Sequence, residues 1–312
     1  MKSDGKRLEK LVAFVEKEML PKGFEVRSNQ RVYDDDGNPL AEFDIEIRGK
    51  IGSTNFAWLI ECRDRPSAGR APGEWIEQLV GRRERFNFNK VTAVSTTGFP
   101  EGIFKFANDK GIELREVKEL SAEEFADWLP IRNIDLNVRG TEVSHAEIII
   151  DKGETRERQE ALSQVITGIS AKTDFLRDMK NGEKVSPIVA FYRAVLSVNN
   201  GGLFDGLEPN GPQKAITLKQ EFQEDAYFVV DTACGPVRVK AIVFKGELFL
   251  RKIVLPLEGS VTYRDAATED VISLAAAFAS PTISGISYSF DLHIIPSKEK
   301  AVFSIRKTEQ GR

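Results

Sequence analysis

Two carboxylates and one cation lie near the ends of two short apolar runs of the sequence. Asp44 belongs to the first run, and Glu61 and Arg63 close the second. Both runs are rich in the β-branched and aromatic residues that favour strands. Because the side chains of a strand alternate between its two faces, Glu61 and Arg63 point to one side and Cys62 points to the other.

The first run spans residues 41–47 and the second spans residues 56–63. By alternation, Asp44 should share a face with the neighbouring acids, opposite the apolar side chains. Those acids are Glu42 and Glu46, and the apolar residues are Phe43, Ile45 and Ile47. If the runs pair as a hairpin, the side chains of Asp44, Glu61 and Arg63 converge. Such a set can hold a divalent cation against a phosphodiester, because carboxylates bind hard cations and a basic group stabilises developing negative charge.

The composition is that of a globular protein. The 312 residues include 29% charged and 41% hydrophobic residues, and the net charge is −4. This length predicts one large or two ordinary domains. No apolar run reaches the length of a membrane span, so we expect a cytoplasmic protein with no membrane partner. Cysteines and histidines are few and far apart, which argues against a disulfide framework, a zinc site and a Cys–His hydrolase. They are Cys62, Cys234, His145 and His293.

A local basic excess follows the second run. From Arg63 to Lys90, seven Lys or Arg residues stand against four Asp or Glu residues. Such an excess beside two carboxylates suits a phosphate-bearing partner. It equally suits a solvated helix whose charges pair with one another, so both interpretations stay open. Within this segment, Gln78, Arg82 and Arg85 are spaced at i, i+4 and i+7, which places them on one helical face.

The N-terminal third predicts a mixed sheet flanked by helices. Hydrophobic periodicity and turn residues define the elements. Predicted helices cover residues 6–20, 74–86 and 99–108, and predicted strands cover residues 24–32, 41–47, 56–63, 91–96 and 112–117. The order is α-β-β-β-α-β-α-β, which indicates an α/β domain.

The pattern changes after Pro130, and we expect a domain boundary there. The prediction is an α/β domain of residues 1–130 and a β-rich α+β domain of residues 131–312, because short strands at such spacing indicate an antiparallel sandwich or barrel. Its predicted helices lie near 154–170 and 187–198, and its strands include 215–221, 226–230, 237–244, 248–254, 288–295 and 301–305. DNA recognition, dimerisation and binding of a partner protein are all open roles for it.

Six segments in helix-strand-strand-helix-strand order support a family resemblance. They are Leu8-Glu9, Glu42-Phe43-Asp44, Leu59-Ile60-Glu61-Cys62-Arg63, Gln78, Val94-Ser95-Thr96-Thr97-Gly98-Phe99 and Gly111-Ile112-Glu113-Leu114. This set resembles the PD-(D/E)xK nuclease superfamily, which has the restriction-endonuclease-like fold, and its Mrr-like branch above all. The resemblance covers residues 8–117, about a third of the chain.

The resemblance implies a role for each matching residue. Asp44 and Glu61 would bind Mg²⁺ or Mn²⁺ together with the backbone carbonyl of Cys62. Glu9 would face the metal site from the first helix. Gln78 would position the metal, a water or the nucleic-acid backbone. DNA would be the partner, and a homodimer is one arrangement that the resemblance allows.

Arg63 departs from the family pattern, which usually has Lys at this position. A guanidinium stays protonated in proteins, so Arg63 could stabilise a transition state but could not act as a general base. Three hypotheses follow. The first is a Mg²⁺-dependent, Mrr-like DNA endonuclease that hydrolyses phosphodiester bonds. The second is a catalytically silenced nuclease-fold module that binds nucleic acid or a protein. The third is an interaction protein whose carboxylates are fortuitous.

Overall fold

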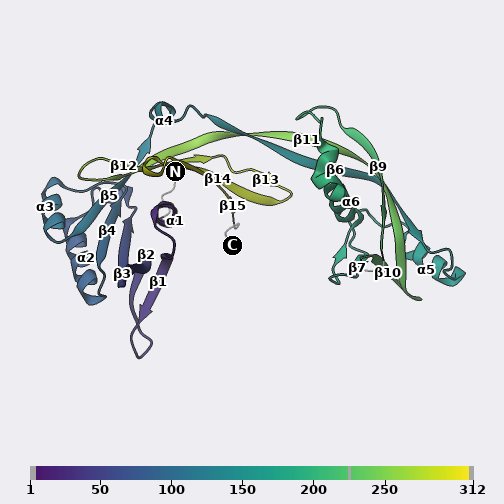
Figure 1. Cartoon of the computed structure of the whole chain (residues 1–312), viewed down its shortest axis with the longest axis horizontal. Coiled ribbons are helices and arrows are strands. Elements are labelled where there is room, and N and C mark those ends of the chain that lie inside the picture. The colour runs from purple at the N-terminus through teal and green to yellow at the C-terminus, as the bar shows by residue number, and fades with distance from the viewer. Residues whose placement is uncertain (1–4, 224–225, 309–312) are drawn as a thin grey trace. The chain divides into compact units, whose positions relative to one another are not determined.

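The computed structural model describes residues 5–223 and 226–308. The chain forms two compact units, shown in Figure 1. Unit 1 combines Met1–Ile134 with Leu255–Arg312, and unit 2 is Asp135–Val254. Among the described residues, no helix is long and apolar enough to cross a membrane.

The first part of unit 1 is a mixed sheet flanked by helices, as the sequence predicts. Its elements are α1 (Gly5–Met19), β1 (Glu25–Tyr33), β2 (Pro39–Ile51), β3 (Thr54–Arg63), α2 (Gly73–Arg85), β4 (Lys90–Ser95), α3 (Glu101–Asp109), β5 (Ile112–Leu120) and α4 (Ala122–Trp128). The strands lie in the order β1-β2-β3-β4-β5. The pairs β1–β2 and β2–β3 are antiparallel, and β3–β4 and β4–β5 are parallel. The predicted order of elements is therefore confirmed.

The sheet buries one apolar cluster on each face. Leu8, Val12 and Val15 of α1 follow helical spacing and pack against Ile60 of β3. Leu59, the next residue along β3, belongs to the cluster on the other face, beneath α2 and α3. Figure 1 shows α1 on one side of these strands and α2 and α3 on the other. We call these the α1 face and the α2 face.

The C-terminal segment returns to unit 1, which corrects the predicted division at residue 130. The end of β11 (Gly235–Asp265) pairs antiparallel with β5, with Tyr263 opposite Val117. The sheet then continues through β12 (Val271–Phe278), β14 (Ile286–Ile295) and β15 (Lys300–Lys307), with β13 (Thr282–Ile283) beside β14. Residues 131–312 are therefore not a separate domain, because hydrogen bonds to β5 draw their last part into the first sheet.

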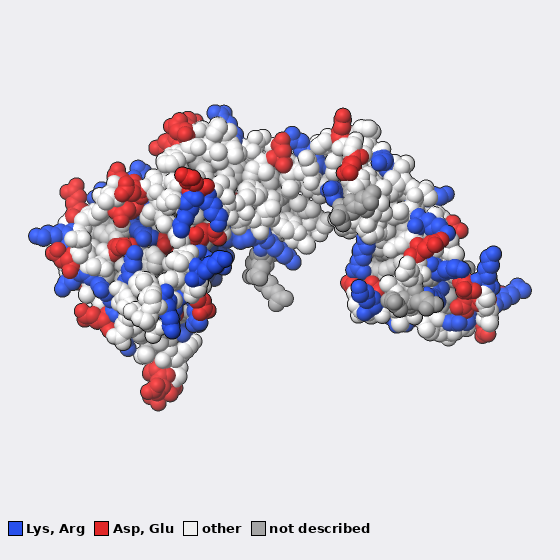
Figure 2. All heavy atoms as spheres, in the orientation of Figure 1, with Lys and Arg blue, Asp and Glu red and all other residues white. Residues whose placement is uncertain are grey.

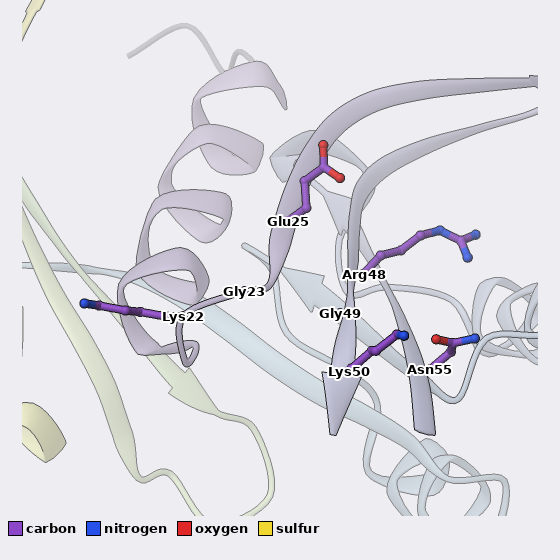
Figure 3. A pocket seen from close by; sticks show the side chains of 7 residues that line it. All are labelled: Lys22, Gly23, Glu25, Arg48, Gly49, Lys50 and Asn55. Atoms are coloured by element: carbon purple, nitrogen blue, oxygen red, sulfur yellow. The ribbon is translucent and has the colours of Figure 1, made fainter. Parts of the chain in front are cut away.

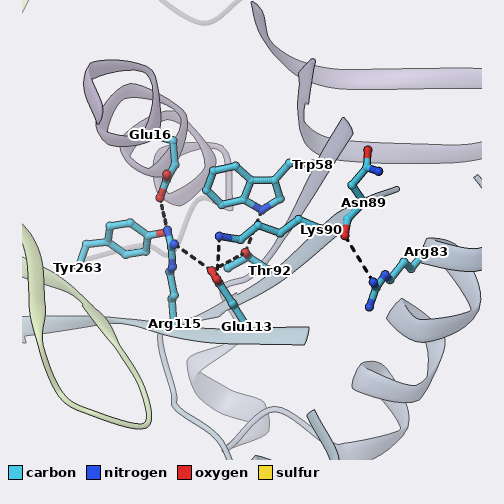
Figure 4. A network of polar contacts seen from close by, with 9 residues as sticks. All are labelled: Glu16, Trp58, Arg83, Asn89, Lys90, Thr92, Glu113, Arg115 and Tyr263. Atoms are coloured by element: carbon cyan, nitrogen blue, oxygen red, sulfur yellow. Dashed lines mark hydrogen bonds and ion pairs between the residues drawn. The ribbon is translucent and has the colours of Figure 1, made fainter. Parts of the chain in front are cut away.

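A polar network on the α1 face anchors this returning segment (Figure 4). The Tyr263 hydroxyl donates to Glu16 of α1 at 2.8 Å, and Arg115 of β5 contacts both residues. Arg115 also donates to Glu113 at 3.0 Å. Tyr263 is 1% exposed, and its partners satisfy the buried hydroxyl. The network therefore joins segments almost 250 residues apart in the chain.

Unit 2 has its own apolar core and its own strands. Its elements are β6 (Asn133–Ile150), α5 (Arg156–Ile166), β7 (Leu176–Asp178), β8 (Lys184–Val185), α6 (Pro187–Ser197), β9 (Lys214–Glu221), β10 (Phe228–Thr232) and the first part of β11. Phe191 of α6 packs against Phe244 of β11 in that core. The predicted strands 237–244 and 248–254 are one continuous strand, because Gly246 and Glu247 stay in register with β9 and no turn forms. The predicted helices near 154–170 and 187–198 are confirmed as α5 and α6. The long strand β6 was not among the predicted elements.

Candidate functional site

The candidate site lies where β2 and β3 separate. Their ladder runs from Ile51 opposite Thr54 to Ile45 opposite Ile60 and goes no further. Beyond it, the backbone N–H of Cys62 donates to the Asp44 Oδ2 at 2.7 Å. A side-chain carboxylate thus takes over as acceptor for a strand N–H group. This contact holds Asp44 beside β3, one residue from Glu61.

The alternation predicted for β2 is wrong at Asp44. Ile45 and Ile47 pack on the α1 face, but Phe43 packs in the cluster of the α2 face. The pairing of β1 with β2 also skips the position of Asp44, and Asn29, which lies opposite, has a left-handed φ of 54°. Because the ladder is interrupted on both sides of Asp44, its backbone leaves the regular pleat and the strict period of two fails.

Glu61 is buried on the α2 face, where a guanidinium meets it. Its side chain is 8% exposed, and the Nη1 of Arg82 lies 2.6 Å from its Oε1. The same Nη1 donates to the backbone carbonyl of Glu42 on β2 at 3.2 Å. Arg82 belongs to the last turn of α2. A cation from the helix therefore bridges the two strands at the point where their ladder has opened.

Loss of solvent makes both carboxylates costly to ionise, and Asp44 adds to that cost at Glu61. Burial and the charge of Asp44 raise the pKa of Glu61 to about 8, and Arg82 opposes this rise. Burial also raises the pKa of Asp44, against the hydrogen bond from Cys62 and the charge of Arg82. Two acids held this close in a partly dry site need a nearby cation before both can ionise.

The other predicted site residues are Glu9, Cys62 and Gln78, and they differ in burial and in their effect on the Asp44–Glu61 pair. Glu9 is partly buried on α1, and its charge contributes to the raised pKa of Glu61 after burial and Asp44. Burial raises the pKa of the Cys62 thiol, whose side chain packs on the α1 face, so only its backbone is available to the site. Gln78 is exposed on α2, one turn before Arg82.

Arg63 follows Glu61 on the same face but makes no ion pair with it. Within residues 5–223 and 226–308, its buried Nε has no hydrogen-bond partner, and its guanidinium lies 6.0 Å from the Trp75 ring centre. The sequence counted Arg82 in the basic segment and placed it by helical spacing beside Gln78, but did not predict its contact with Glu61. That spacing was the available clue, because it placed Arg82 on a face shared with a predicted site residue.

The donors at this point fit a hard divalent cation. Within the part of the chain that the structure describes, no group of three or more His, Cys, Asp or Glu side chains gathers as a metal cluster. Asp44 and Glu61, with the Cys62 carbonyl that the family resemblance implies, could supply a small all-oxygen set of the kind that Mg²⁺ or Mn²⁺ takes. A bound cation would relieve the burial and the repulsion from Asp44 that raise the pKa of Glu61.

Other surface features of unit 1 lie away from this pair. A shallow pocket of about 470 Å³ lies at the turn end of the β2–β3 hairpin, and Lys22 and Lys50 are among its lining residues (Figure 3). The side chain of Lys22 points away from the others in that view. Figure 2 shows acidic side chains at the tip of the β1–β2 hairpin, where the sequence has Asp34, Asp35 and Asp36. Neither feature contributes to the Asp44–Glu61 site.

Comparisons with known proteins give no family. No family model matches the chain, and no curated protein matches it. Among solved structures, one match is a protein of unknown function, AF1548, with 21% sequence identity and a TM-score of 0.29. The match covers 36% of this chain and 57% of AF1548. A likeness at that score carries no argument about fold or function.

Proposed function

We propose that the chain is a metal-dependent DNA endonuclease that hydrolyses phosphodiester bonds, with a restriction-endonuclease-like arrangement in unit 1. The observation that carries this proposal is the pair of half-buried Asp44 and buried Glu61 at the opened end of β2–β3. Buried acids with raised pKa values cost stability, and they are typical of sites where a ligand supplies the compensating charge.

Each residue of the site has a defined part in this proposal. Asp44, Glu61 and the carbonyl of Cys62 would hold Mg²⁺ or Mn²⁺. A bound divalent ion supplies positive charge to the phosphate and makes water easier to deprotonate. Arg63 has no carboxylate partner among the described residues, so its guanidinium is available to a phosphate oxygen. It would stabilise charge and would not accept a proton.

Plasmid DNA incubated with Mg²⁺ or Mn²⁺ tests this function. We expect the wild-type protein to nick or linearise the plasmid, and Asp44→Ala to lose that activity. Glu25→Ala is a matched control, because it removes one acid from an exposed pair with Arg27 on β1. Equal cleavage by wild type and Asp44→Ala would refute the proposal.

A silenced nuclease-fold module that binds nucleic acid or a protein is the second candidate. Two observations favour it: Arg63 stands where the family usually has Lys, and Arg82 already neutralises Glu61. The two candidates differ in outcome. A silenced module that binds nucleic acid slows the migration of a labelled DNA duplex in a gel-shift assay. It leaves that duplex uncleaved with every divalent ion. A cytoplasmic location and a homodimer stay predictions for either candidate.

A further inference from the structure

Arg82 contacts both of the strands that carry the acidic pair. Its Nη1 contacts the Glu61 carboxylate at 2.6 Å and the Glu42 carbonyl at 3.2 Å. Glu42 precedes Asp44 by two residues on β2, and Glu61 lies on β3. Arg82 is therefore a cation in contact with both strands of the proposed metal site.

The two partners of this ion pair differ in their freedom to move. The side chain of Glu61 is 8% exposed, whereas that of Arg82 is 35% exposed. Glu61 extends from a strand in the middle of the sheet, and Arg82 extends from the last turn of α2. The long arginine side chain can leave towards water without moving the backbone, while the carboxylate must stay.

The charge balance explains why a cation has to stay near this pair. An ionised, buried carboxylate that loses its counter-ion bears the full desolvation cost, so Glu61 in its charged form needs either Arg82 or another positive charge. Arg63 does not serve here, since among the described residues its Nε is unpaired and its guanidinium lies near Trp75. Arg82, whose Nη1 lies 2.6 Å from the Glu61 Oε1, therefore supplies the positive charge beside Glu61.

We propose that Arg82 is an internal counter-ion that occupies the divalent-cation position in the metal-free protein and is displaced when the ion binds. This inference depends on the proposed metal site of Asp44 and Glu61. In this proposal, Arg82 is a positioning residue that competes with the metal ion for the carboxylate of Glu61. A residue with a purely structural role would affect metal binding in the opposite direction, because losing it would loosen the site.

Mn²⁺ binding to the metal-free, full-length protein tests this inference, measured by titration calorimetry and by the spin-resonance signal of free Mn²⁺. We expect Arg82→Gln to bind Mn²⁺ about tenfold more tightly than wild type, because the ion no longer has to displace a guanidinium. Arg85→Gln is the matched control, since it removes the same charge from the same helix, and its guanidinium lies over Phe86. It should bind as wild type does. Adding Asp44→Asn to Arg82→Gln should abolish the gain.

Each outcome separates the inference from the function on which it depends. If wild type binds Mn²⁺ and Arg82→Gln binds it equally or more weakly, the displacement of Arg82 is refuted and the metal site stands. If neither protein binds Mn²⁺, the metal site itself is refuted and the inference falls with it. Binding by Arg82→Gln alone supports the inference and identifies Arg82 as the group that silences the site. Should Arg82→Gln fail to fold, Arg82→Lys carries the comparison. Its shorter side chain makes a weaker contact, so it too should bind Mn²⁺ more tightly than wild type.

Discussion

The carboxylate of Asp44 accepts the backbone N–H of Cys62 at 2.7 Å, at the point where the β2–β3 ladder ends. A ladder normally satisfies such a group with a backbone carbonyl. Here a side chain does so, and in doing so it is fixed beside Glu61. The break in the sheet and the placement of the acidic pair are therefore one structural feature.

Asp44→Asn should separate this structural role from metal binding. An asparagine side-chain oxygen can still accept the N–H of Cys62, so we expect the melting temperature to stay within a few degrees of wild type. The lost negative charge should abolish Mn²⁺ binding and lower cleavage by on the order of 100-fold or more. Calorimetry and plasmid nicking measure the two effects. Wild-type metal affinity in Asp44→Asn would show that the pair is not the ligand set.

Arg63→Ala should reduce DNA cleavage without reducing metal affinity. If Arg63 stabilises negative charge on the phosphate, its loss should raise the barrier by about 2–4 kcal/mol. Metal affinity should hold or rise, because a cation near the ion is removed. Arg63→Lys should retain or increase cleavage, since Lys is the residue that the family resemblance predicts. Single-turnover cleavage rates check both variants. Equal rates for wild type and Arg63→Ala would remove Arg63 from the mechanism.

Metal affinity should depend on pH through Glu61. Its pKa is raised to about 8 by burial and by Asp44, so at pH 6 the metal-free protein holds a proton that the ion must release. The apparent affinity for Mg²⁺ should therefore rise by up to about tenfold per pH unit below pH 8 and level off above it. Titrations in buffers of different ionisation enthalpy measure the released proton. A constant affinity from pH 6 to pH 8 would contradict a raised pKa.

His293 should make the protein sensitive to acid. Its ring is 2% exposed and lies 4.2 Å from the Phe14 ring, and burial lowers its pKa to about 4 from 6.5. Between these values the unfolded chain binds the proton more strongly, so the free energy of unfolding should fall as the pH drops from 6.5 towards 4.

His293→Phe should remove this loss, on the order of 2 kcal/mol, while preserving the ring contact with Phe14. Glu61 acts in the opposite direction in the metal-free protein, since a raised carboxyl pKa makes stability fall as the pH rises from 4.5 towards about 8. The measured quantity is therefore the difference between variant and wild type in urea unfolding at pH 4.5 and pH 7. Parallel pH profiles for the two proteins would show that His293 is not the titrating group.

Unit 1 should fold after unit 2 is excised. The chain leaves and re-enters unit 1 side by side, because the Leu257 N–H donates to the Arg132 carbonyl at 2.9 Å. Replacing residues 135–254 with a Gly/Ser linker of about four residues should give a folded, metal-binding protein. Residues 1–134 alone should be much less stable, because β5 then loses its partner strand and Glu16 loses Tyr263. Circular dichroism melting of the two proteins decides the point, and an unfolded excision variant would contradict the division into units.

The amino-acid sequence by itself determined the local elements and the positions of the acidic residues within them. Alternating and helical periodicities depend on neighbours only a few residues away, so the order of elements up to residue 117 was predictable. The same reasoning placed both acids near strand ends, which is correct for Glu61 on β3, whereas β2 is longer than predicted and holds Asp44 in its interior. It also showed that Arg63 and Cys62 point to opposite faces of β3, as the structure has them.

The tertiary structure determines three features that the periodicity of the sequence does not predict. The return of residues 260–265 to β5 depends on hydrogen bonds between segments more than 100 residues apart. The irregular backbone at Asp44 depends on ladders breaking on both of its sides. The contact of Arg82 with Glu61 depends on how α2 packs across the sheet. Each of these results from long-range packing, in which the burial of whole faces and the pairing of distant strands outweigh the preferences of the local sequence.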